Sequence, residues 1–278
     1  MTVLTCLCLY LLVMAFAYLV SDRMIFPVRR RTYEDGPEIL KLKTADGARI
    51  SAIYLPNPAA RFTLLFSHGN AEDLGDASDY LEELRDHGYS VFAYDYHGYG
   101  TSEGSPSEKN AYLDVQAAYD YLVRELKTPP DRIIALGRSV GAGAAIDLAS
   151  KNPLAGLIVE SAFATAFRVV THVALFPFDK FRNIDKIGKV RCPVLVMHGE
   201  NDEIVAFWHG RKLFEKANEP KSRLWVPGAG HNDLMIAAGQ RYWEAIEQFT
   251  KTLGQSAERT SSASAPSDAV VEPENVSY

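Results

Sequence analysis

The sequence predicts an α/β protein built on a mainly parallel, doubly wound sheet that begins with an antiparallel pair of strands. Strand and helix patterns alternate along most of the chain, as they do in doubly wound folds. Most strand patterns are short, continuous apolar runs, which is typical of strands covered by helices on both faces. The first two strand patterns instead alternate apolar and polar residues. At 278 residues and 47% apolar, the chain suits one or two domains of ~150 residues.

The chain opens with 18 uncharged residues, Val3–Val20, which meet the lower length limit for a membrane span. No Lys or Arg precedes this run, whereas Arg23 and residues 29–31, all Arg, follow it. Because secretory signals usually carry basic residues before the apolar run, we expect residues 1–21 to be a retained single-pass anchor. The position of the arginines favours a cytoplasmic folded domain.

A cleaved signal peptide is the alternative interpretation of the same segment. Ala15-Phe16-Ala17 fits a signal-peptidase site after a short apolar region. Cleavage there would make the protein secreted or periplasmic.

The folded domain is expected over residues 22–254. Two alternating segments, Glu38–Lys43 and Arg49–Leu55, are joined by Ala45-Asp46-Gly47, which indicates a hairpin. The later strands are predicted at Phe62–Phe66, Ser90–Tyr94, Arg132–Leu136, Gly156–Val159, Pro193–Met197 and Arg223–Val226. Helical periodicity is found in Leu74–Asp86, Glu108–Leu126, Val205–Ala217 and Asn232–Leu253. Residues 255–278, rich in Ser, Ala, Pro and Glu, are predicted to be a disordered tail.

The motif Gly137-Arg138-Ser139-Val140-Gly141 lies between an apolar strand pattern and a small-residue helical pattern. A Gly-x-Ser-x-Gly motif in that context indicates a sharp turn that exposes a nucleophilic serine. The helix that follows favours negative charge developing near its N-terminus. A structural turn between a strand and a tightly packed helix is the alternative.

A serine nucleophile needs a base and an acid later in the chain, in the order Ser, acid, His. His231 fits the base, because its glycine-rich loop Gly228-Ala229-Gly230 joins the last strand to the last helix. Asp202 follows the strand Pro193–Met197 and is the predicted acid, which would orient the imidazole. Glu160, which also ends a strand, and Glu200 are the rivals for this role.

Two backbone N–H groups are expected to bind the oxyanion of a tetrahedral intermediate. One belongs to Val140, the residue after the serine. The other is assigned to Asn70, because Gly69 lets the loop after Phe62–Phe66 approach closely.

Composition excludes several other classes of site. The net charge of −6, without a long basic run, argues against a nucleic-acid partner. Three cysteines, two of them in the apolar N-terminus, cannot build a disulfide framework or a cysteine-based zinc site. No cofactor or metal is implied. Oligomeric state is not indicated by the sequence.

With the serine motif, Asp202 and His231 in place, the chain resembles the α/β-hydrolase superfamily over roughly residues 26–253. Four further motifs resemble the α/β-hydrolase-domain seventeen family within it: Phe66-Ser67-His68-Gly69-Asn70-Ala71-Glu72-Asp73-Leu74-Gly75, Tyr94-Asp95-Tyr96-His97-Gly98-Tyr99-Gly100-Thr101-Ser102-Glu103-Gly104, Pro106-Ser107-Glu108 and Gly228-Ala229-Gly230-His231-Asn232-Asp233. The resemblance implies an α/β-hydrolase fold and matches Ser139, Asp202 and His231 to the family triad. It also implies removal of palmitate from cysteine thioesters on membrane proteins. The N-terminus differs: in place of the family's acylated cysteine cluster stands an apolar run, as in membrane-anchored relatives.

The insert Ser161–Arg191 is too short for a large cap domain and carries five phenylalanines. These rings are expected either to pack the insert onto the sheet or to line an apolar acyl slot. The leading hypothesis is a membrane-associated serine hydrolase acting on carboxylic esters or acyl thioesters, with a lipidated protein as one candidate substrate. A serine peptidase or aminopeptidase of the same fold and a non-catalytic binding module are the alternatives.

Overall fold

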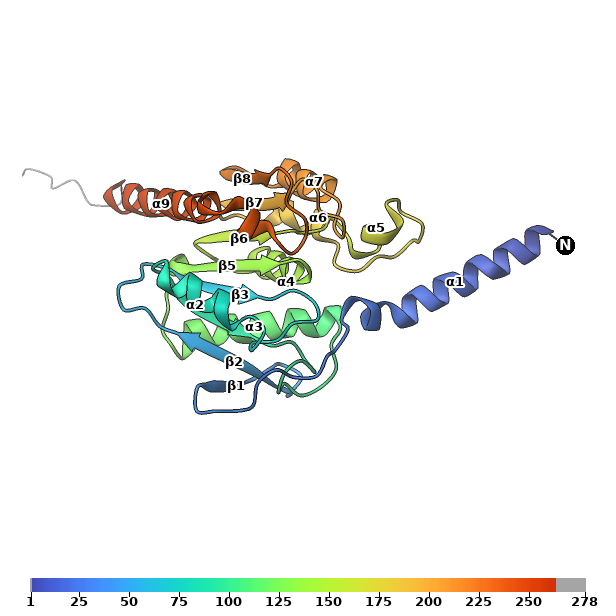
Figure 1. Ribbon diagram of the computed structural model, residues 1–278, viewed down its shortest axis with the longest axis horizontal. Coiled ribbons are helices and arrows are strands. Elements are labelled where there is room, and N and C mark those ends of the chain that lie inside the picture. Colours follow the sequence, from blue (N-terminus) through green and yellow to red (C-terminus); the bar gives the residue numbers. More distant parts are fainter. Residues whose placement is uncertain (1, 264–278) are drawn as a thin grey trace, which may run out of the picture.

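A computed structural model describes residues 2–263 of the chain, and an eight-stranded sheet forms its centre (Figure 1). The strands are β1 (Ile39–Lys43), β2 (Arg49–Leu55), β3 (Thr63–Ser67), β4 (Ser90–Tyr94), β5 (Ile133–Arg138), β6 (Gly156–Glu160), β7 (Val194–Gly199) and β8 (Lys221–Val226). Their spatial order is β1-β2-β4-β3-β5-β6-β7-β8. The pairs β1–β2 and β2–β4 are antiparallel, and every later pair is parallel. The predicted fold class is therefore confirmed.

Helices cover both faces of this sheet. The α-helices are α1 (Thr2–Ile25), α2 (Ser78–Asp86), α3 (Glu108–Arg124), α4 (Val140–Ala149), α5 (Ala166–Thr171), α6 (Asn183–Lys186), α7 (Trp208–Lys216), α8 (Leu234–Ala238) and α9 (Gln240–Ala263). Apolar side chains of α3, α4 and α7 form one core with the sheet, and those of α2, α8 and α9 form a second core on the opposite face. Two buried faces explain why every residue of β3, β4 and β6 is buried and why most of them are apolar.

All eight predicted strands are present, and their ends lie within two residues of the predicted ones. Two helices begin later than predicted, because carboxylates hold the preceding backbone in turns. Before α2, Asp73 accepts hydrogen bonds from the N–H groups of residues 75 and 76, and Asp95 accepts one from Leu74. Before α7, Asp202 accepts the N–H groups of Ile204 and Val205.

The C-terminal helix differs from the prediction in two ways. A single helix over Asn232–Leu253 is wrong, because Gly239 with φ +54° separates α8 from α9. Helix α9 also continues to Ala263, into the predicted disordered tail. Once a helix has started, each added residue gains a backbone hydrogen bond, so α9 extends through residues 255–263, where no proline interrupts it. Residues 264–278 of the predicted tail lie outside the described part.

Helix α1 is longer than the predicted anchor segment, since it runs to Ile25. Ser21, at the predicted boundary, is 4% exposed, and Phe26 is a core residue. The helix projects from the domain at the end of the sheet where α5 lies (Figure 1). It is the one helix among residues 2–263 that is long and apolar enough to cross a membrane.

Candidate active site

Strand β5 ends in a sharp turn at Ser139, whose backbone has φ 53° and ψ −115°. The flanking glycines make this turn possible. A Cβ on Gly141 would lie 2.0 Å from the carbonyl oxygen of Ser67, and a Cβ on Gly137 would lie 2.5 Å from that of Gly141. Any larger residue would collide with backbone, so the motif needs glycine at both positions. The turn places the serine directly before α4.

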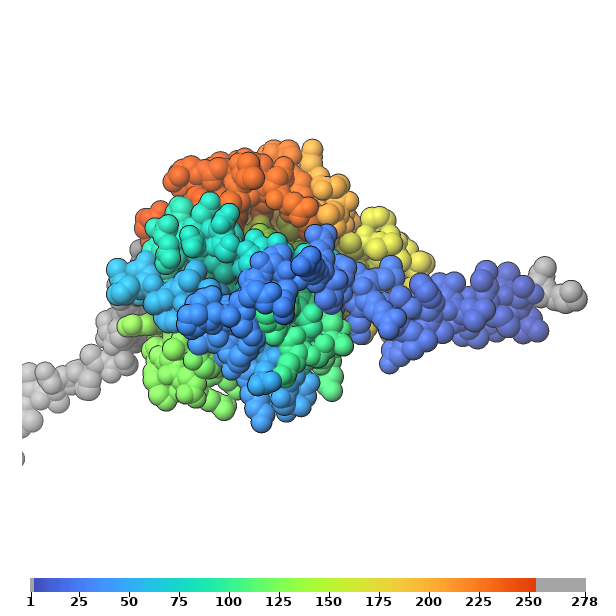
Figure 2. Space-filling model, turned by 60° about the horizontal axis from the view of Figure 1, so that its bottom comes forward, coloured from blue at the N-terminus to red at the C-terminus, as the bar shows by residue number. Residues whose placement is uncertain are grey.

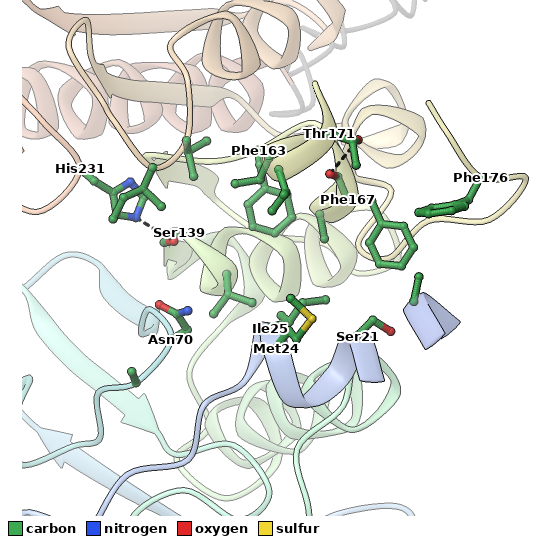
Figure 3. Close-up of a pocket in the computed structure, with 18 of the residues that line it drawn as sticks. Ser21, Met24, Ile25, Asn70, Ser139, Phe163, Phe167, Thr171, Phe176 and His231 are labelled. Atoms are coloured by element: carbon green, nitrogen blue, oxygen red, sulfur yellow. Dashed lines mark hydrogen bonds between the residues drawn. The ribbon is translucent and has the colours of Figure 1, made fainter. Parts of the chain in front are cut away.

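A chain of hydrogen bonds connects three residues from three strand ends. The Ser139 hydroxyl donates to Nε2 of His231 at 3.0 Å (Figure 3). Nδ1 of the same ring donates to the Asp202 carboxylate at 2.8 Å. Ser139 follows β5, Asp202 follows β7 and His231 follows β8. In such an arrangement the imidazole can take the hydroxyl proton while the carboxylate fixes the orientation of the ring.

Asp202 is held by more groups than the sequence indicated. Burial acts to raise the pKa of its carboxyl, but hydrogen bonds from His198, His231 and the backbone of Val205 outweigh burial and lower that pKa well below its usual range. Nε2 of the fully buried His198 lies 3.3 Å from the carboxylate. From the sequence, His198 could be placed after the strand Pro193–Met197 as a hydrogen-bonded structural residue, but its contact with the acid was not predicted.

The rival carboxylates do not contact the imidazole. Glu160 is buried, which raises its pKa, and it accepts a hydrogen bond from the Tyr242 hydroxyl at 2.8 Å. Glu200 is exposed. Of the three candidate acids, the structure therefore brings only Asp202 into contact with His231.

The two predicted oxyanion donors lie beside Ser139. Val140 is the first residue of α4, so its N–H has no carbonyl partner within the helix. Asn70, in the loop after β3, lies close to Ser139 and lines the same cleft (Figure 3).

A partly buried ion pair, which no sequence motif predicted, ties the Asn70 loop to the serine turn. Glu72 accepts the N–H of Gly69 with one carboxylate oxygen and pairs with the Arg138 guanidinium through the other. Burial acts to raise the pKa of Glu72, but Arg138 outweighs burial and lowers it. Because Arg138 directly precedes Ser139, this pair fixes the distance between the loop and the serine.

Curated relatives share this chain's sequence over most of its length. The α/β-hydrolase domain-containing protein 17B of Xenopus tropicalis is 41% identical over 220 residues, which cover 78% of this chain and 76% of the relative. The human protein of the same name is 40% identical with the same coverage. The chain belongs to the α/β-hydrolase domain-containing protein 17 family. A family model described as "Serine aminopeptidase, S33" also matches residues 58–183.

Solved structures agree with the α/β-hydrolase fold of this family member. The Pyrococcus furiosus esterase Pf2001 superimposes with a TM-score of 0.68 at 20% identity, over 81% of this chain and 98% of the esterase. A monoacylglycerol lipase from Paleococcus ferrophilus gives a TM-score of 0.58 at 20% identity, over 73% of this chain and 98% of the lipase. At these identities the likeness concerns the fold alone.

In this α/β-hydrolase domain-containing protein 17 relative, the serine lies at the base of a cleft of about 660 Å³. The phenylalanines of the insert divide between the two expected roles. Phe181 is fully buried in the core, whereas Phe163, Phe167 and Phe176 line the cleft (Figure 3). Among residues 2–263, no group of three or more His, Cys, Asp or Glu is placed to hold a metal ion.

Proposed function

We propose that the protein is a membrane-associated serine hydrolase that cleaves carboxylic esters or acyl thioesters through an acyl-enzyme on Ser139. The observation that carries this proposal is the hydrogen-bonded chain from Ser139 through His231 to Asp202, at the base of an apolar cleft. Family membership makes a hydrolase of this kind the expected activity.

The chemistry follows from the contacts. Ser139 Oγ attacks the substrate carbonyl carbon while His231 Nε2 takes the hydroxyl proton, and Asp202 stabilises the imidazolium. The N–H groups of Asn70 and Val140 bind the oxyanion. His231 then gives its proton to the departing alcohol or thiol. A water molecule, deprotonated by His231, attacks the acyl-enzyme and releases the carboxylic acid.

The substrate class is proposed from the lining of the cleft. Phenylalanines and aliphatic side chains dominate it, so an acyl chain gains more there than a charged group does. Because the family resemblance implies action on palmitoylated cysteines, S-acylated membrane proteins are included among the proposed substrates. Helix α1 is proposed to anchor the enzyme in the membrane.

A peptidase is the second candidate, favoured by the description of the matching family model. An aminopeptidase must bind a protonated amine beside the scissile bond, which calls for a free carboxylate. Two acidic side chains line a second space beside the serine, and both are engaged elsewhere, Glu72 with Arg138 and Glu160 with Tyr242.

The test uses the full-length protein in detergent micelles. We expect a fluorophosphonate probe to label the parent enzyme and not Ser139→Ala, because the probe phosphonylates an activated serine. In a panel of p-nitrophenyl esters, acyl thioesters and peptide amides, turnover of esters or thioesters should fall roughly 10⁴-fold in Ser139→Ala. Activity of the variant within tenfold of the parent would refute the nucleophile, and turnover of amides alone would favour the peptidase.

A further inference from the structure

The cleft above Ser139 has two walls that are far apart in the sequence. One wall is the insert, through Phe163, Phe167 and Phe176. The other is α1, whose lining residues extend from Val13 to Ile25. Figure 3 shows Ser21, Met24 and Ile25 of α1 facing the phenylalanines across the space that leads away from Ser139. The part of α1 that lines the cleft is about 18 Å long, at 1.5 Å per residue.

Specific contacts hold α1 against the insert. The Tyr10 hydroxyl donates to the carbonyl oxygen of Leu175 at 2.9 Å, and the rings of Tyr18 and Phe178 meet edge to face at 5.6 Å. Nearer the domain, Lys180 pairs with Asp22 at 3.0 Å. The helix therefore forms a fixed wall of the cleft, and does not act merely as a flexible tether.

These contacts place part of the insert at membrane depth if α1 spans the bilayer. Tyr10 lies 11 residues before Ser21, or about 16 Å along the helix, roughly half of the ~30 Å hydrocarbon core. Val170, Val173 and Leu175 are 76%, 58% and 52% exposed, as lipid-facing side chains would be. The Leu175 carbonyl has a donor in Tyr10, which backbone in lipid requires. In Figure 2 the yellow surface around α5 lies beside the blue rod of α1.

We propose that α1 is a wall of the acyl-binding site, and that a long-chain acyl group reaches Ser139 from within the bilayer, lying along α1 between Ala17 and Phe167. This inference rests on the proposed function and names its substrate class: an ester or thioester whose long acyl chain stays in the membrane. Because the cleft runs beside a membrane-spanning helix, the chain need not leave the lipid to be cleaved.

Two alanines of α1 give a matched pair of variants. Ala17 lines the cleft, whereas Ala15 is exposed and does not line it. Residues two positions apart point to different sides of a helix. Ala17→Trp should fill the cleft between α1 and the insert, while Ala15→Trp adds the same side chain away from it. Both variants keep α1 as the anchor. A difference in activity between them therefore reflects the role of α1 in lining the cleft and not its role in membrane attachment.

The measurement is kcat/KM for p-nitrophenyl esters of increasing acyl length in micelles. We expect the ratio of hexadecanoyl to butanoyl ester hydrolysis to fall at least tenfold in Ala17→Trp and to stay within twofold of the parent in Ala15→Trp. Equal ratios in the two variants would overturn the inference. If the parent itself showed no Ser139-dependent hydrolysis of any ester, the proposed function would be refuted instead. Two substrates in vesicles distinguish the sources of such an acyl chain. A palmitoyl thioester on a membrane peptide represents an S-acylated protein, and a long-chain glycerol ester represents a lipid.

A covalent probe tests the geometry without altering α1. In a hexadecyl fluorophosphonate with a terminal diazirine, Ser139 Oγ displaces fluoride from phosphorus, and irradiation then links the chain end to its neighbours. We expect crosslinks in residues 13–21 of α1 or in 163–176 of the insert. The second space beside Ser139 is lined by Met235 and Ile236 of α8, and crosslinks confined to α8 would overturn the inference.

Discussion

Ser139 occupies a backbone region that costs a non-glycine residue about 1–3 kcal/mol. The surrounding structure holds it there, because its N–H donates to the Glu160 carbonyl at 2.9 Å and both neighbouring glycines pack against backbone. The strain serves the proposed chemistry, since it keeps the hydroxyl against His231. At the same scale, Asp202 is surrounded by donors, so its carboxylate stays ionised well below neutral pH.

The acid can be tested by comparing two conservative substitutions. Asp202→Asn should lower kcat by about 10³–10⁴-fold, because the imidazole loses the charge that fixes its tautomer. Glu160→Gln should stay within tenfold of the parent, because Glu160 contacts Tyr242 and not His231. Steady-state kinetics on one ester measures both. A crippled Glu160→Gln beside an active Asp202→Asn would show that the acid is misassigned.

At the scale of elements, the insert is attached to the domain by a few buried polar contacts. The N–H of Ala164, just before α5, donates to Nδ1 of His209 in α7 at 3.0 Å. Asn183 of α6 donates its side-chain amide to the carbonyl of Phe163 at 2.9 Å. These contacts set the position of the phenylalanines that line the cleft.

The His209 contact predicts a loss of stability on acidification. Burial and the neighbouring His198 lower the pKa of His209 to about 4, against ~6.5 for a free histidine. Its folded form is thus neutral and accepts from Ala164. Neutral His209 therefore contributes its full stabilisation of the folded state above about pH 6.5. This contribution is lost as the pH falls from about 6.5 toward 4, because in that range the unfolded chain binds a proton at His209 and the folded chain does not.

Denaturant unfolding of full-length protein in micelles between pH 7 and pH 4.5 measures this effect. The free energy of unfolding should fall more steeply with decreasing pH in the parent than in His209→Gln, which keeps an acceptor but does not titrate. Parallel curves for the two proteins would contradict the assignment.

At the scale of the whole molecule, α1 joins two proposed roles, membrane attachment and formation of the cleft. Ser21 is buried within its last turns, and the core residue Phe26 follows its last residue directly, so no flexible linker separates the helix from the domain. The site would then be held at a fixed distance from the bilayer, which raises the effective concentration of membrane-borne substrates.

Fractionation tests the attachment. Full-length protein should sediment with membranes and stay there in high salt, because salt screens charge contacts but does not extract a spanning helix. Protein lacking residues 1–20 should be soluble, and should lose far more activity on long-chain substrates than on short water-soluble esters. Sequencing the N-terminus of the mature protein can contradict the anchor. A start at Tyr18 would mean that the chain is cleaved after Ala17 as a signal peptide is.

The sequence by itself determined the features that depend on near neighbours in the chain. Side-chain alternation, apolar runs and turn residues located all eight strands and the antiparallel start, because each pattern reflects one segment's own burial. The Gly-x-Ser-x-Gly turn was readable for the same reason, since its steric demand is local. Ser139, Asp202 and His231 could be nominated from strand ends, and their catalytic roles stay a prediction.

Tertiary structure alone decided the features that depend on distant segments meeting. Asp202 and Glu160 both follow parallel strands, and only packing shows which of them contacts His231. The Glu72–Arg138 pair and the hydrogen bond from the Leu74 N–H to Asp95 before α2 both join residues that are distant in the sequence. The cleft joins α1 to the insert about 150 residues later. No local pattern encodes such a contact, because its energy comes from the surface that two remote segments bury together.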